Sequence, residues 1–142
     1  PVSDLVARMG YKTQGYRELY ETEYHIGESA FENHETYLER SPAWNTHKLE
    51  TPLMVYGNTN DDDVNILEIR HLVKSLKADD KDFIYKEYED VPGGHYFARM
   101  DHKVAREARY GIYNFLAEYL SPERPFKNIK EMEKASYKFV SR

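Results

Sequence analysis

The middle of the chain contains two patterns of apolar and polar positions, one typical of strands and one typical of helices. Residues 51–57, TPLMVYG, form a short apolar run that a glycine ends, which is typical of a buried strand of a parallel sheet. Residues 83–88, FIYKEY, alternate apolar and polar side chains and predict a second strand. After each strand, apolar residues recur at helical spacing, over 64–77 and over 103–120. The pattern predicts the order strand, helix, strand, helix.

This order predicts an α/β fold with a parallel sheet, because a right-handed crossover through a helix joins successive parallel strands. Residues 1–50, which glycines and a proline interrupt, predict two or three short helices. Residues 121–142 form a charged tail, with one short helix expected over 128–138. We therefore expect a helical segment (1–50), a β-α-β-α unit of the same domain (51–120), and a tail.

The composition excludes several classes of function. With 142 residues, of which 40% are hydrophobic, the chain has material for one modest domain. Its 20 basic and 25 acidic residues form no long block of one sign, so we expect no nucleic-acid partner. The chain has no cysteine, which excludes disulfides and thiolate metal sites and fits exported and intracellular proteins alike. No apolar run approaches the ~20 residues that cross a bilayer, so we expect no membrane partner.

The two loops that follow the strands carry the candidate chemistry, because functional groups of open parallel sheets gather at the carboxyl ends of the strands. The first loop is NTNDDDV (58–64), and the second is DVPGGHYF (90–97). If the strands are neighbours, an aspartate of the first loop reaches His95 of the second. Such a pair is the orienting half of a nucleophile, histidine and carboxylate triad, in which the imidazole transfers protons and the acid fixes its tautomer.

The glycines before His95 favour this interpretation. Gly93 and Gly94 permit a turn with positive φ and leave room for a substrate beside the imidazole. The alternative is an ordinary turn followed by an incidental surface histidine.

These residues resemble the final third of the catalytic domain of prolyl oligopeptidase-family serine peptidases, which have the α/β-hydrolase fold. The strand TPLMVYG, the aspartate loop, the GGH motif and the long last helix carry the resemblance, and ERSPAW (39–44) is similar to the segment that leads into the strand. The resemblance is strong from about Glu39 to Leu120. It implies the C-terminal strand-helix-strand-helix part of an α/β-hydrolase domain, a peptide substrate, dipeptidyl or oligopeptidase activity, and no cofactor.

The resemblance implies that His95 is the catalytic histidine and that the 58–64 loop supplies the triad acid. In the family the acid stands three residues after the glycine that ends the strand, and here that position is Asn60. Asp61 keeps the family spacing of three residues to Val64, so we take Asp61 as the acid. Asp62 and Asp63 are the alternatives.

Two further sets of residues have expected roles. Asp62 or Asp63 would cap the helix that follows the loop, where a carboxylate accepts from free N–H groups. Tyr96 and Phe97 would line a substrate pocket beside His95, with packing as the alternative role.

A nucleophile is missing from the pattern. The family's G-x-S-x-G elbow stands between a strand and a helix, and the only approximation here is GESAF (27–31), which has Phe31 in place of the second glycine and no strand before it. We expect Ser29 to be a helix N-terminus instead. In the family the serine precedes the part that corresponds to this chain. We therefore expect the chain to be a C-terminal fragment, inactive alone, whose partner is the upstream part of the same polypeptide.

Other functions fit parts of the pattern. The triad would also serve an esterase or thioesterase, and a hydrolase-like scaffold without its nucleophile would be an assembly module. Asn58, Asn60 and Asp62 resemble the first ligands of a calcium loop, but the glycine and glutamate that such a loop needs are missing, and the histidines lack zinc-binding spacing. We expect no metal.

The small sheet predicts self-association of the isolated chain. Two parallel strands are marginal in water, and their edges and faces need cover. We expect copies to associate through Leu53–Tyr56 or Phe83–Tyr88 and the helical stripes beside them.

Overall fold

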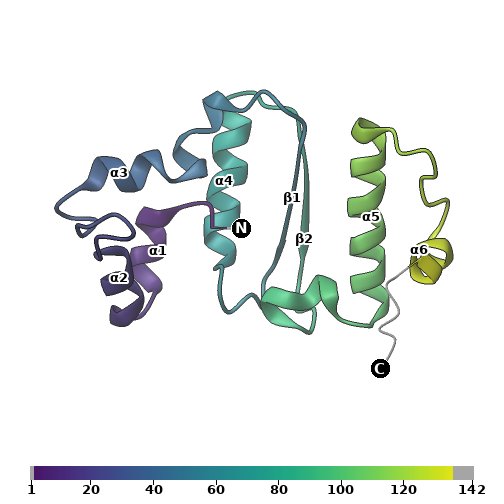
Figure 1. The fold of residues 1–142 in the computed structure, drawn as a ribbon, viewed down its shortest axis with the longest axis horizontal. Helices are drawn as coiled ribbons and strands as arrows, with labels where there is room; N and C mark the ends of the chain where they lie inside the picture. The colour runs from purple at the N-terminus through teal and green to yellow at the C-terminus, as the bar shows by residue number, and fades with distance from the viewer. Residues whose placement is uncertain (1, 136–142) are drawn as a thin grey trace.

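A computed structural model describes residues 2–135 (Figure 1). Within this range the regular elements follow each other along the chain as α1 (Leu5–Tyr11), α2 (Gln14–Tyr20), α3 (His34–Glu39), the 3₁₀ turns η1 (Pro42–Trp44) and η2 (Thr46–Lys48), β1 (Leu53–Asn58), α4 (Ile66–Ala78), β2 (Phe83–Tyr88), the 3₁₀ helix η3 (Gly94–Arg99), α5 (Lys103–Leu120) and α6 (Ile129–Ala135). The predicted order of strands and helices is confirmed. The end of the short helix expected over 128–138 lies outside the described residues.

The two strands pair in parallel and in full register, from Leu53 opposite Phe83 to Asn58 opposite Tyr88. Figure 1 shows α4 on one side of the sheet and α5 on the other. Because both strands end at the same level, the loops after them leave the sheet side by side. The observed architecture is an α/β fold with a two-stranded parallel sheet, as expected for part of an α/β-hydrolase.

The main core lies between α4 and β1. Alternation along the strand turns Val55 and Gly57 toward the helix, whose apolar stripe contributes Ile69, Leu72, Val73 and Leu76. A Cβ on Gly57 would lie 2.8 Å from Cδ1 of Ile66, so glycine allows the start of the helix to approach the end of the strand. The approach places the α4 N-terminus directly beside the first candidate loop.

The start of α4 differs from the prediction. The helix begins at Ile66, and its N-cap is Asn65, whose side chain accepts a hydrogen bond from the Leu67 N–H at 2.9 Å. The prediction that Asp62 or Asp63 caps this helix is therefore wrong. Those carboxylates lie in the loop before the cap and contact other groups.

A second core anchors the histidine loop on the opposite face of the sheet. Phe97 from η3 is 2% exposed and packs against the rings of Tyr56 and Tyr88, with centroid separations of 5.8 and 4.9 Å. Val91 and Ala108 close the cluster. The burial of Phe97 fixes the short 3₁₀ helix on which the candidate histidine stands.

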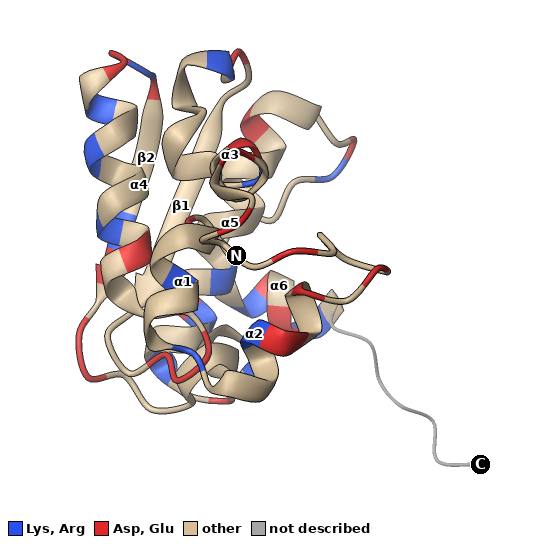
Figure 2. Cartoon of the chain, turned by 90° about the vertical axis from the view of Figure 1, so that its left-hand side faces the viewer, with Lys and Arg blue, Asp and Glu red and all other residues tan. Residues whose placement is uncertain are grey.

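The segment before the sheet packs beside α4, as Figure 1 shows, and has its own small core of Leu5, Met9 and Tyr37. Three helices form between Asp4 and Arg40, in agreement with the prediction. Figure 2 shows basic residues along α4 and acidic residues in nearby loops, so both signs of charge are spread over this side of the molecule. No helix among residues 2–135 is long and apolar enough to span a membrane.

The two predicted helical stripes differ in burial. The stripe of α4 is covered, whereas the C-terminal half of α5 leaves four large apolar side chains exposed: Tyr113, Leu116, Tyr119 and Leu120. η1, η2 and the loop before α4 complete the core against which α4 packs.

Candidate active site

The parallel register brings Asp61 and His95 together. Nδ1 of His95 lies 2.9 Å from Oδ2 and 3.1 Å from Oδ1 of Asp61, although 34 positions separate the two residues. The imidazole is about one-third exposed, whereas the carboxylate is 15% exposed. This geometry suits a proton on Nδ1 that is donated to the carboxylate, which leaves Nε2 as the nitrogen that can accept a proton.

The backbone of its own loop holds the Asp61 carboxylate in place. Its Oδ1 accepts hydrogen bonds from the N–H groups of Asp63 at 2.9 Å and Val64 at 2.8 Å. Its neighbour Asp62 has a different contact, since Oδ1 of Asp62 accepts from the backbone N–H of His95 at 3.4 Å. Asp61 therefore contacts the side chain of His95, and Asp62 contacts its backbone.

Both glycines before His95 are required by the backbone. Gly93 has φ 105° and Gly94 has φ 52°, which place both in the left-handed region. A Cβ on Gly93 would lie 2.8 Å from Cα of Phe97, and one on Gly94 would lie 3.0 Å from Oδ1 of Asp62. The double glycine turns the chain sharply between the end of β2 and η3, and it lets the two loops touch.

Asp63 is drawn away from the imidazole by two cations of the N-terminal segment. Its Oδ1 pairs with Nη2 of Arg8 at 2.8 Å and with Nζ of Lys12 at 2.7 Å, while its Oδ2 stands 3.9 Å from Nε2 of His95. The hydrogen bond from Lys12 lowers the pKa of Asp63, partial burial opposes this, and the charge of Arg8 lowers it further. Asp63 therefore stays ionised and directed toward α1, and no hydrogen bond from residues 2–135 occupies Nε2.

A buried ion pair connects α1 to the start of α4. Arg8 and Glu68 are each 1% exposed, and Nη1 of Arg8 lies 3.2 Å from Oε1 of Glu68. The other oxygen of Glu68 accepts from the N–H groups of Ser3 and Asp4 at 3.1 and 3.2 Å. The Tyr11 hydroxyl also donates to Glu68, and burial together with this bond raises the Tyr11 pKa to about 12. The helical segment is thereby fixed beside the acid loop.

A hollow of about 180 Å³ adjoins the pair, and Tyr56, Asn58, Asp61, His95, Tyr96, Phe97 and Arg99 are among its lining residues. Tyr96 is exposed and stands edge-on to the His95 ring, while the guanidinium of Arg99 lies 5.2 Å from the centroid of the Tyr96 ring. The volume is below the roughly 300 Å³ at which small-molecule pockets begin. It can therefore hold only part of a peptide.

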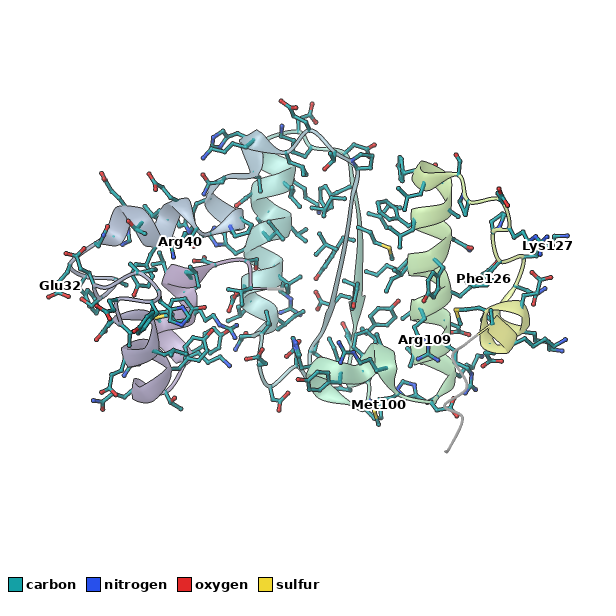
Figure 3. All side chains as sticks on the ribbon, viewed as in Figure 1. Glu32, Arg40, Met100, Arg109, Phe126 and Lys127 are labelled. Carbon is teal, nitrogen blue, oxygen red and sulfur yellow. The ribbon has the colours of Figure 1, made fainter. Side chains whose placement is uncertain are left out.

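A larger hollow of about 480 Å³ lies between α5, α6 and the end of η3, and neither Asp61 nor His95 lines it. Figure 3 labels three of its lining residues, Met100, Arg109 and Phe126. Arg109 donates to the carbonyls of Ala98 at 2.6 Å and Met100 at 2.9 Å, which fixes the end of η3. Because Asp61 and His95 line only the smaller hollow, the smaller hollow is the candidate site.

No serine of residues 2–135 lines the smaller hollow or bonds to the imidazole. Ser29 precedes a single turn and α3 begins only at His34, so the prediction that Ser29 is a helix N-terminus is wrong. Its Oγ accepts from the Glu32 N–H, and the Glu32 carboxylate accepts from the Ser29 N–H and hydroxyl. Within the same range, no three His, Asp or Glu side chains are grouped to hold a metal ion.

A family model described as the prolyl oligopeptidase family, Peptidase S9, matches residues 1–123. The chain belongs to the prolyl oligopeptidase family. The match covers the N-terminal helices, the acid loop, the histidine loop and all of α5, so it extends well before Glu39, where the sequence resemblance was weak. No curated protein and no solved structure matches the chain.

The sequence pattern predicts no role at the site for three of its residues. Asn58 matches only a calcium ligand, and Arg8 and Lys12 match no motif. A partial signal existed, because Arg8 lies in the last turn of α1 and Lys12 is the C-cap residue four positions later, which places two cations near the same end of the helix. The partner of that face, Asp63, can be found only from the tertiary structure.

Proposed function

We propose that this chain supplies the histidine and the acid of a serine peptidase triad, with His95 as the general base and Asp61 as the residue that orients it. The contact of 2.9 Å between His95 Nδ1 and Asp61 Oδ2 carries this proposal, and membership of the prolyl oligopeptidase family supports it. The nucleophilic serine comes from the upstream part of the same polypeptide.

In this proposal Nε2 of His95 accepts the proton of the serine hydroxyl as its oxygen attacks the peptide carbonyl. The imidazolium then donates that proton to the leaving amine, and a water repeats both steps to release the acyl group. Asp61 keeps its negative charge throughout and stabilises the imidazolium through Nδ1–H. The two backbone N–H groups that bond Asp61 Oδ1 keep the carboxylate from rotating away.

The substrate in this proposal is a peptide, and the activity is of the dipeptidyl or oligopeptidase type. Tyr96 borders the hollow beside His95 and would contact the residues that flank the scissile bond, whereas Phe97, which is buried against Tyr56 and Tyr88, would support this wall from behind. Acyl transfer by such a triad needs only the three side chains and donors for the oxyanion, so the proposal includes no cofactor.

Active-site labelling with a fluorophosphonate tests the proposal. The 142-residue chain should not be labelled, whereas a polypeptide extended upstream to include a strand and a G-x-S-x-G elbow should be labelled stoichiometrically and should cleave peptides. His95→Ala should abolish both reactions in the longer polypeptide, and His47→Ala, which removes an exposed histidine far from the site, should abolish neither. Labelling of Ser29, or full activity of the His95→Ala variant, would refute the proposal.

A further inference from the structure

Asn58 has a buried side chain whose amide nitrogen and oxygen both form hydrogen bonds. It is the last residue of β1 and is 1% exposed. Its Nδ2 donates to the carbonyls of Val91 at 2.9 Å and Gly94 at 3.2 Å, and its Oδ1 accepts from the Asn60 N–H at 3.2 Å. Because carbonyls only accept and an N–H only donates, these neighbours fix the orientation of the amide.

The bonds of Asn58 lead to both members of the candidate pair. Asn60 directly precedes Asp61, and the Asp61 N–H donates to the backbone carbonyl of Asn58 at 3.0 Å. Gly94 directly precedes His95 and is held in the left-handed region, with φ 52°. One residue therefore contacts the backbone immediately before the acid and immediately before the histidine.

We propose that Asn58 is a positioning residue, whose amide sets the separation between Asp61 and His95 by tying the acid loop to the histidine loop. Its importance for catalysis rests on the function proposed above. The geometric role can be tested without any catalytic activity.

The role requires an amide. Aspartate would keep the shape, but it would lose both donors and would place a carboxylate oxygen against two carbonyl oxygens in a buried site. Serine is too short to reach the carbonyls of Val91 and Gly94 together with the Asn60 N–H. Either substitution frees the turn at Gly93 and Gly94 from the end of β1, and His95 then moves relative to Asp61.

Thr59 offers a matched control. Its Oγ1 accepts from the Asp90 N–H at 2.8 Å, so it also joins the two loops, but it does so at the start of the second loop rather than next to His95. Thr59→Ala removes one bond between the loops and leaves every bond of Asn58 in place.

Proton NMR of the 142-residue chain provides the test. An Nδ1–H that is donated to a carboxylate resonates far downfield of the backbone amides, and disappearance of the signal in His95→Gln assigns it. Wild type and Thr59→Ala should show the resonance, and Asn58→Asp and Asn58→Ser should lose it at a temperature where circular dichroism shows them folded. If Asn58→Asp does not fold, Asn58→Ser, which adds no charge, still decides the question.

Two results would overturn the proposal: an unchanged resonance in a folded Asn58 variant, or its loss in Thr59→Ala to the same extent. In an extended polypeptide that carries the nucleophile, Asn58→Ser should lower kcat roughly 100-fold with little change in KM, because displacement of a catalytic group costs about that much. If the wild-type chain shows the resonance but the extended polypeptide cleaves no peptide, the proposed function fails and the positioning role of Asn58 stands.

Discussion

At the scale of single residues, three consecutive aspartates differ only in what surrounds each carboxylate. Asp61 accepts from its own loop and contacts His95 Nδ1, and Asp63 pairs with Arg8 and Lys12. In an extended, active polypeptide, Asp61→Asn should therefore lower kcat by about 10⁴-fold, because the amide favours the wrong tautomer of the imidazole. Asp63→Asn should lower kcat less than tenfold and stability by about 1 kcal/mol or less, since its ion pairs are partly exposed.

Steady-state kinetics and urea unfolding of the two variants check this prediction. A larger kinetic loss in Asp63→Asn than in Asp61→Asn would assign the triad acid to Asp63. The helix cap should be unaffected in both variants, because Asn65 supplies it.

The lowered pKa of Asp63 also predicts a pH dependence of stability. Its folded-state value lies below the ordinary 3.8, chiefly through the hydrogen bond from Lys12, so the pair stabilises the fold fully above pH 3.8 and less as pH falls through the folded-state value. Lys12→Met should therefore lower the free energy of unfolding at pH 7, and the difference from wild type should shrink below pH 3.8. Urea titrations across this range measure it. A difference that is independent of pH would show that Lys12 acts through packing alone.

At the scale of elements, a buried charge attaches α1 to α4. Glu68 contacts Arg8, the N–H groups of Ser3 and Asp4, and the Tyr11 hydroxyl. Glu68→Leu should destabilise the chain by about 3 kcal/mol or more, because it leaves the guanidinium of Arg8 and two buried N–H groups without that carboxylate. Glu107→Gln is the matched control, since its pair with Lys103 is exposed and 3.8 Å long, and it should change stability little.

Urea unfolding at pH 7 measures both variants. Equal effects of the two substitutions would show that the N-terminal segment does not depend on Glu68 for its attachment.

The sequence predicted the elements whose own residues determine them. β2 and α5 span 83–88 and 103–120 as expected, because alternation and a helical stripe are local signals. The juxtaposition of Asp61 and His95 followed from the rule for parallel strand ends. The cap of α4 and the partners of Asp63 were not predictable in this way, since a run of polar residues does not show which one faces α1, the backbone or solvent. Asn58, predicted as the first residue of the 58–64 loop, is instead the buried last residue of β1, and only the strand register shows this.

At the scale of the whole molecule, the exposed half of α5 and the open edges of a two-stranded sheet predict self-association. Burying Tyr113, Leu116, Tyr119 and Leu120 between copies would remove apolar surface from water at a gain of about 25 cal/mol per Å². Sedimentation of the chain at micromolar concentration should show dimers or larger species, and Leu116→Glu combined with Leu120→Glu should shift the distribution toward monomer. A wild-type chain that is monomeric and unfolds cooperatively would show that these surfaces need no partner.

The parallel pairing of β1 with β2 has a consequence for engineering. Asp61 and His95 are brought together by strands and loops within one short stretch of chain, so under the proposed function their alignment does not depend on a covalent link to the serine. Under the proposed function, the peptide bonds before this stretch could be cut and the two halves attached to separate carriers. Peptide cleavage would then report the meeting of the carriers, as in a split-enzyme sensor.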